Sequence, residues 1–175
     1  MIRQNFVFKE SQRMVRRCGS RDPFDLLDEI KAVILFSRAY AADGLKGYCT
    51  ILNRTKYVVI NGCLPDEEQA VIAGHECAHL VLHRDRIISN PLNGVKDFRI
   101  YDNSSEIDRE ANFFLADFIV SDKDALEAAY EYDFFEIACE LGIPAPLLAY
   151  KYQSMRDRRF QVRVPIDVDS LFLRT

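Results

Sequence analysis

Three features are missing from this 175-residue sequence, and each absence narrows the class of protein. It has no long apolar run, and Arg3, Lys9 and Glu10 place charge near its start, so neither a signal peptide nor a transmembrane helix is expected. It has no excess of positive charge, because a formal net charge of −4 gives no global attraction to nucleic acid or anionic membranes. It also has no repeat or low-complexity linker, which predicts a single domain over residues 1–175.

The five cysteines are widely spaced, and no C-x-x-C pair indicates a redox motif or a second metal site. An odd number of cysteines without such pairs is typical of a protein in a reducing compartment. Together with the missing signal peptide, this pattern predicts a cytoplasmic protein.

The sequence contains only three histidines, and all of them fall within nine residues, from His75 to His83. The first five residues of that stretch match the H-E-x-x-H pattern of zinc peptidases. The four-residue spacing places His75 and His79 on one face of a helix, where both can bind one ion, with Glu76 beside them as general base. His83 lies about 12 Å along the helix from His75, so we expect it at the helix end or behind the ligands.

Residues 70–82, which carry the motif, are apolar on almost every side, and this indicates a helix that passes through the core. Polar side chains buried there without partners would cost about 1 to 3 kcal/mol each, and more for a carboxylate. A metal ion would supply the partner. The alternative is a chance match whose histidines are hydrogen-bonded within the core or at its edge.

The spacing of apolar residues predicts an α+β fold that is mostly helical, with a small β-hairpin beside the motif helix. Strands are expected over 48–52 and 56–60, around a turn at 53–55. Residues 85–104 are interpreted as a surface loop near the site, because turn-forming pairs interrupt them. After an amphipathic opening over 4–17, helices are expected over 23–41, 65–84, 106–120, 123–130, 134–141 and 146–155.

A catalytic zinc ion usually takes three protein ligands, so two histidines imply a third donor elsewhere. The helix expected from residue 106 offers Glu106, Asp108 and Glu110 in its first turns. Spacing alone does not choose among these acids. The ordinary alternative for each is a solvated helix start, where the helix dipole favours negative charge.

Over roughly residues 10–155 the sequence resembles the ImmA/IrrE family of metallopeptidases, which leaves 156–175 as a tail. The resemblance implies a zincin-like metallopeptidase domain with bound zinc. It also implies cleavage of a helix-turn-helix (XRE-type) transcriptional repressor, which derepresses genes of a mobile element or a stress response. The matching segments are Arg21-Asp22-Pro23-Phe24, Leu45-Lys46-Gly47-Tyr48, Val59-Ile60-Asn61, the stretch from Glu68 to His83, and Glu110-Ala111-Asn112-Phe113-Phe114.

In that family the third ligand is an acidic residue three positions before an Ala-Asn pair, and this position falls on Asp108. The helix geometry agrees, because Asp108 shares a face with Asn112, one turn further on. The resemblance therefore implies that His75, His79 and Asp108 bind zinc and that Glu76 is catalytic. Asn112 is then placed to hold a ligand histidine through its second nitrogen.

The sequence departs from the family pattern at two places. The family more often has Glu at the ligand position, and aspartate is one methylene shorter, so the helix of Asp108 would have to lie closer to the metal. It also more often has Leu-Gly where this chain has Cys77-Ala78, and we expect Cys77 to pack in the core on the far side of the helix. For Glu106 and Glu110 the solvated helix start is the preferred interpretation, and Glu110 is the first substitute if Asp108 is not the ligand.

Peptide hydrolysis also needs a hydrogen-bond donor to the developing oxyanion. Tyr48, His83 and Tyr101 are candidates that the sequence does not rank. The hairpin strand just before the motif helix is expected to offer an edge on which an extended substrate adds as a further strand.

A second hypothesis is a non-catalytic regulatory or DNA-binding protein with a peptidase-like fold. Residues 135–144 resemble the first half of a helix-turn-helix, but the following helix is too apolar to read a DNA groove. The basic cluster near the C-terminus is more often a solvated face, although it could dock an acidic partner. We expect no direct contact with nucleic acid or membrane, and the sequence leaves the oligomeric state open. The cluster consists of Lys151, Arg156, Arg158, Arg159 and Arg163.

Overall fold

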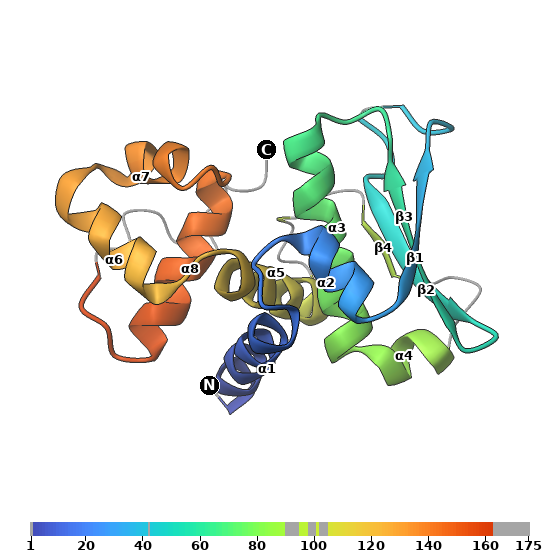
Figure 1. The fold of residues 1–175 in the computed structure, drawn as a ribbon, viewed down its shortest axis with the longest axis horizontal. Helices are drawn as coiled ribbons and strands as arrows, with labels where there is room; N and C mark the ends of the chain where they lie inside the picture. The colour runs from blue at the N-terminus through green and yellow to red at the C-terminus, as the bar shows by residue number, and fades with distance from the viewer. Residues whose placement is uncertain (1, 42, 90–94, 98–100, 102–104, 163–175) are drawn as a thin grey trace.

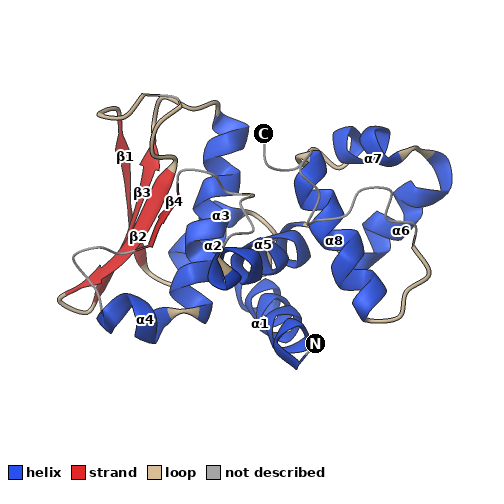
Figure 2. Cartoon of the chain, turned by 180° about the vertical axis from the view of Figure 1, so that it is seen from behind, coloured by secondary structure: helices blue, strands red, loops and turns tan. Residues whose placement is uncertain are grey.

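The computed structural model describes residues 2–41, 43–89, 95–97, 101 and 105–162. A four-stranded sheet lies at one end of the molecule and a cluster of three helices, α6 to α8, at the other (Figures 1 and 2). The helices α3 and α5 lie between them, with α1 and α2 packed alongside. This arrangement confirms the expected fold class, a mostly helical α+β domain with a small sheet beside the motif helix.

The N-terminal part contains α1 (Ile2–Cys18) and α2 (Pro23–Glu29). The helix start at Pro23 is confirmed, because the Asp22 side chain accepts a hydrogen bond of 2.8 Å from the Phe24 amide as a cap. The expected continuation to residue 41 is wrong. Lys31 turns the chain at a φ of 55°, and β1 (Ala32–Ser37) follows, rich in the β-branched and aromatic residues that favour a strand.

The sheet has the strand order β1-β3-β2-β4. The expected hairpin is confirmed as β2 (Gly47–Leu52) and β3 (Thr55–Asn61), which pair antiparallel. Asn53 and Arg54, at φ values of 50° and 67°, form the two-residue turn whose twist suits a hairpin. However, β3 is an inner strand, because β1 pairs parallel to its other side, so the expected substrate edge on that strand is wrong.

The segment expected to be a surface loop is partly regular. It contains α4 (Arg84–Ser89) and β4 (Val95–Asp97), and β4 pairs antiparallel with β2. The remaining parts of this segment, residues 90–94, 98–100 and 102–104, lie outside the described residues.

The long motif helix α3 (Asp66–Leu82) packs against β2 and β3 on one side and against α2 and α5 on the other. The second long helix, α5 (Glu106–Ile119), starts after Ser105, as expected. Every residue of α3 from Val71 to Leu80 is buried, which confirms a helix through the core.

The C-terminal helices also lie where the sequence predicts them, as α6 (Asp122–Glu131), α7 (Phe134–Glu140) and α8 (Ala145–Asp157). The helix α8 is buried without a break from Leu147 to Met155, so it presents no face to a DNA groove.

The basic residues near the C-terminus do not form one solvated face. The ammonium group of Lys151 is buried and lies 2.9 Å from Asp117 and 2.7 Å from Asp122. Arg158 pairs with the same two carboxylates. The interpretation as a solvated face is wrong for these two cations, because they join α5, α6 and α8, whereas Arg163 lies outside the described residues.

Candidate metal centre

Two buried histidines of α3 face an acid of α5. The Nε2 atoms of His75 and His79 lie 3.1 Å apart, and Asp108 Oδ1 lies 3.6 Å from His79 Nε2. A tetrahedral ion with bonds of about 2.0 to 2.1 Å holds its ligand atoms about 3.3 to 3.4 Å apart, so both distances suit one ion. Ligand atoms of all three residues lie within 4.8 Å of one another. The structure therefore brings together the three residues that the sequence predicts as ligands.

The close approach of α3 and α5 explains how the short Asp108 side chain reaches the site. Gly74, next to the first histidine, packs directly against Leu115 of α5 and against Pro23 of α2. A Cβ atom at this position would overlap Leu115 Cδ1 and would lie 3.3 Å from Pro23 Cβ. Because no side chain separates the helices here, α5 lies close enough for an aspartate to stand where the family more often has a glutamate.

Glu76 is fully buried and lies beside the start of β2. A Cβ atom on Gly47 would lie 3.1 Å from Glu76 Oε1 and 2.5 Å from Ile72 Cγ2. The missing side chain at Gly47 therefore leaves the room that the carboxylate uses. Gly47 pairs with Asp97 of β4, so among the described strands the neighbour of the strand nearest to this carboxylate lies at the edge of the sheet.

Each histidine of the pair is held from behind by its other ring nitrogen. His75 Nδ1 lies 2.9 Å from Asn112 Oδ1, and the Asn112 amide nitrogen lies 3.4 Å from the hydroxyl of Tyr150. The carbonyl oxygen can only accept, so His75 carries its proton on Nδ1 and directs the lone pair of Nε2 toward the site. This is the supporting role expected of Asn112.

His79 is held by a second chain of hydrogen bonds, through His83. The Nδ1 atoms of His79 and His83 lie 3.0 Å apart, and His83 Nε2 lies 3.0 Å from Glu110 Oε2. Burial lowers the pKa of His83, although the hydrogen bond with Glu110 opposes this effect. His83 follows the last residue of α3, which confirms its expected place at the helix end.

The two remaining acids of α5 differ from each other. Glu106 is exposed and pairs with Arg3 at 3.3 Å, as expected for a solvated helix start. The same interpretation is wrong for Glu110, because the helix turns this side chain inward against His83 and leaves it buried. Glu110 is therefore a partner of the histidine chain and does not belong to the group of possible ligands.

The structure also shows which of the three candidate oxyanion donors have a group available for the substrate. Both ring nitrogens of His83 face His79 and Glu110, so His83 has none left for a substrate. The Cβ direction of Gly47 points at α3, and neighbouring strand residues point to opposite faces, so Tyr48 points away from the site.

The third candidate, Tyr101, has a buried hydroxyl that makes no hydrogen bond within the described part of the chain. Burial raises the pKa of Tyr101, and the neighbouring Glu68 and Tyr150 add to this effect. The hydroxyl therefore keeps its proton and can donate it.

Several residues that support the site could not be predicted from the sequence, because nothing in the sequence sets them apart. Nothing in the spacing of charged residues distinguishes Glu110 from its neighbours, and Tyr150 reads as an ordinary core residue. The two glycines, Gly47 and Gly74, are visible in the sequence, but only the packing of helix against strand and helix shows why a side chain is missing there.

The chain matches a family model described as the IrrE N-terminal-like domain over residues 28–156, from the end of α2 to the end of α8. The chain belongs to this family. Its members are metallopeptidases, so the chain is a peptidase-type hydrolase, and the resemblance to the ImmA/IrrE family is confirmed. No curated protein sequence matches the chain. Within the described residues, no helix is both long and apolar enough to cross a membrane.

Proposed function

We propose that this member of the family is a zinc-dependent endopeptidase. The supporting observation is the triangle of donor atoms from His75, His79 and Asp108, whose spacing suits one tetrahedral ion. Two imidazoles and one carboxylate are the ligand set of many catalytic zinc sites, which keep a fourth position for water. The resident ion would lower the pKa of a bound water toward 7 and polarise the substrate carbonyl.

Glu76 is the general base of this proposal. It accepts a proton from the attacking water as the water oxygen bonds to the carbonyl carbon, and it returns that proton to the leaving nitrogen as the C–N bond breaks. Its place next to the first histidine ligand, in the room left by Gly47, supports this role.

Tyr101 is the oxyanion donor of this proposal, because Tyr48 points away and His83 is engaged behind His79. Tyr150, whose charge would add to the raised pKa of Tyr101, hydrogen-bonds to Asn112, the partner of His75, and this supports a place for Tyr101 on the side of the ligands. A neutral hydroxyl held away from solvent donates to a developing oxyanion without prior rearrangement.

The substrate binds as an extended strand along β4, the edge strand that pairs with Gly47. Such binding requires the substrate to unfold locally and favours one partner protein over general digestion. The resemblance stated above points to a cytoplasmic helix-turn-helix repressor as that partner.

The test is a cleavage assay with the zinc-loaded protein and a helix-turn-helix repressor as the candidate substrate, with casein as the comparison substrate. We expect two repressor fragments with the wild-type chain, one intact band with Glu76→Gln, and little digestion of casein. The amide of Glu76→Gln cannot accept the proton but leaves the metal ligands in place. If Glu76→Gln produces fragments at the wild-type rate, Glu76 is not the general base. If casein is digested rapidly, the protein is a general protease and not the regulator of one partner.

A further inference from the structure

The helical end of the molecule carries a groove that the peptidase chemistry does not use. It has a volume of about 700 Å³ and lies between α6, α7, α8 and the residues that follow α8. Its floor is formed by buried side chains, among them Phe134, Ile137 and Tyr152. The Tyr152 hydroxyl donates to the Ala125 carbonyl at 3.2 Å and so fixes this ring in the floor.

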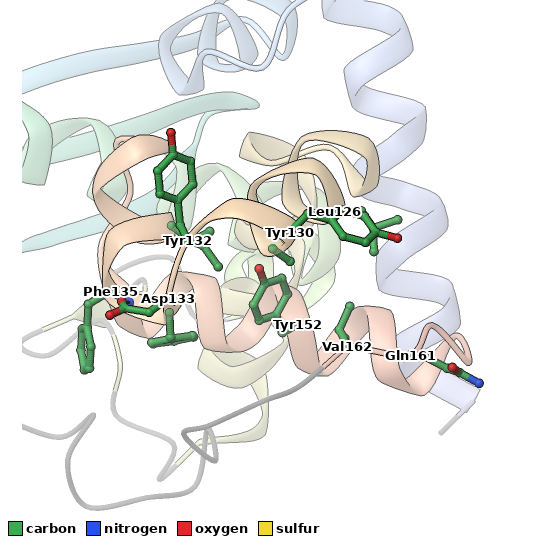
Figure 3. A pocket seen from close by; sticks show the side chains of 11 residues that line it. Leu126, Tyr130, Tyr132, Asp133, Phe135, Tyr152, Gln161 and Val162 are labelled. Carbon is green, nitrogen blue, oxygen red and sulfur yellow. Dashed lines mark hydrogen bonds between the residues drawn. The ribbon is translucent and has the colours of Figure 1, made fainter.

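Large aromatic side chains stand exposed around this floor. Tyr130 is 89% exposed, Phe135 is 52% exposed and Tyr132 is 40% exposed, although all three line the groove. In the view of Figure 3, Tyr152 lies between Tyr130 and Phe135. Exposed aromatic side chains next to an apolar groove are typical of the centres of protein interfaces, where Tyr and Phe are enriched.

The helices α6 and α7 that border the groove are rich in exposed acids, and their single cation, Lys123, lies 3.7 Å from Glu127. From Asp124 to Tyr150 the sequence contains no Lys, Arg or His. All six acids of this stretch are exposed; Asp133 lines the groove, and Glu127, Glu131 and Glu136 are each next in sequence to a lining residue. These six acids are Asp124, Glu127, Glu131, Asp133, Glu136 and Glu140.

We propose that this acidic aromatic groove docks a basic amphipathic segment of a protein partner. The partner places one or two large apolar side chains in the groove, and its Lys and Arg side chains pair with the surrounding carboxylates. Like charges would repel an acidic segment, so charge complementarity selects the sign of the partner. If the proposed function holds, this partner is the substrate protein. It docks in the groove and is cleaved separately, at the metal centre on α3.

The direct test is fluorescence anisotropy with the full chain and a labelled amphipathic peptide that carries Leu and Trp on one face and Lys and Arg on the other. We expect saturable binding that weakens about tenfold or more between low and high salt, because screening reduces the attraction between charges. A peptide with Glu in place of every Lys and Arg should not bind. Equal binding of both peptides, or no binding of the basic one, overturns the proposal.

Matched variants locate the binding. Phe135→Ala and Glu131→Lys should each weaken it about tenfold, whereas Phe6→Ala and Asp28→Lys, at exposed positions on α1 and α2, should leave it within about twofold. Neither pair of positions belongs to the metal centre. Equal losses for both pairs would show that the peptide binds without using the groove.

Two further measurements separate this inference from the proposed function. Binding should persist in Glu76→Gln and after treatment with a chelator, because the groove contains no residue of the metal centre. Loss of binding in either case would place the peptide at the metal centre and overturn the docking site. Sedimentation should show a monomer. A dimer that Phe135→Ala dissociates would mean that a second copy of the chain, and not a basic partner, occupies the groove.

Discussion

His79 and His83 share one proton between two nitrogens that face each other at 3.0 Å. If Nε2 of His79 binds a metal, its Nδ1 must carry the proton and donate it to Nδ1 of His83. His83 then carries its own proton on Nε2 and donates it to Glu110, 3.0 Å away. Only one arrangement of protons satisfies the whole chain, so a carboxylate two residues beyond Asp108 determines which nitrogen of His79 is free for the metal.

Removing this chain should weaken metal binding without removing a ligand. We expect His83→Phe to lower zinc affinity by about 10- to 100-fold, because His79 loses the acceptor that fixes its tautomer. Chelator competition measures the affinity, and nitrogen-detected NMR of the loaded wild-type protein should show the proton of His83 on Nε2. Arg86→Ala, at an exposed position of the next helix, is the control. An unchanged affinity in His83→Phe would assign His83 to packing alone.

The third ligand is tested by comparing acids of one helix. Asp108→Ala should abolish stoichiometric zinc binding in elemental analysis, because one of the three ligands is lost. Glu106→Ala removes an exposed carboxylate from the same turn and should keep one zinc ion per chain. If the two variants hold equal amounts of zinc, Asp108 is not a ligand.

Gly74→Ala should destabilise the protein, although alanine is normally favoured over glycine inside a helix by about 1 kcal/mol. The added methyl group overlaps Leu115, and overpacking of this kind costs about 1 to 3 kcal/mol. The variant should also bind zinc more weakly, because α5 and its Asp108 are pushed away from α3. Urea denaturation and chelator competition measure the two effects. Leu115→Ala, combined with Gly74→Ala, should recover part of the lost affinity, and a purely additive double variant would contradict the explanation.

Tyr101→Phe should lower kcat for cleavage of a peptide substrate by about 100-fold or more, with KM and zinc content nearly unchanged. In the proposed mechanism the hydroxyl contacts the oxyanion only as the transition state forms, and the substitution leaves the ring in place. Tyr48→Phe, on the other face of the sheet, should have little effect. A change in KM alone would make Tyr101 a substrate-binding residue.

Acid should weaken the contacts between α5, α6 and α8. Although burial opposes the change, hydrogen bonds from Arg158 and Lys151 lower the pKa of Asp122 to about 2. A carboxyl whose pKa is lower in the folded chain than the ordinary value of 3.8 stabilises the fold at pH values above 3.8. This contribution disappears as the pH falls toward 2. Because the Asp122 carboxyl is partly exposed, we expect acidification to lower the free energy of unfolding by about 1 kcal/mol through this group.

Asp122→Asn should show this loss already at neutral pH and a flatter stability profile between pH 4 and 2, measured by urea denaturation. The neighbouring Asp117 acts in the opposite direction, because burial raises its pKa above the ordinary value and so favours its protonated form. An unchanged acid profile in Asp122→Asn would mean that other carboxyls control the transition.

The sequence predicts those parts of the molecule whose signal is local. The spacing of His75, Glu76 and His79 within one apolar helix fixes their common face, and the cap at Asp22 fixes the start of α2. The two turn residues between β2 and β3 also suffice for the hairpin. Each of these features depends on fewer than ten neighbouring residues.

The features that the sequence misses depend on partners far along the chain. The strand β1 follows a helix without a conventional stop signal, and its pairing with β3 across more than twenty residues overrides the helical interpretation. Glu110 is buried only because α5 crosses the end of α3 at His83. The inner position of β3 likewise follows from that same pairing, so the location of the substrate edge could not be read from the hairpin alone.

The burial of Cys77 bears on how the protein withstands oxidants. Its thiol is fully buried on α3, and burial raises its pKa well above that of an ordinary cysteine. Peroxides attack the thiolate, so this sulfur is nearly inert even though it belongs to the metal-binding motif. The exposed thiols of Cys63 and Cys139 react first. Oxidative damage therefore begins at the surface, and the chemistry of the motif outlasts the first modifications of the chain.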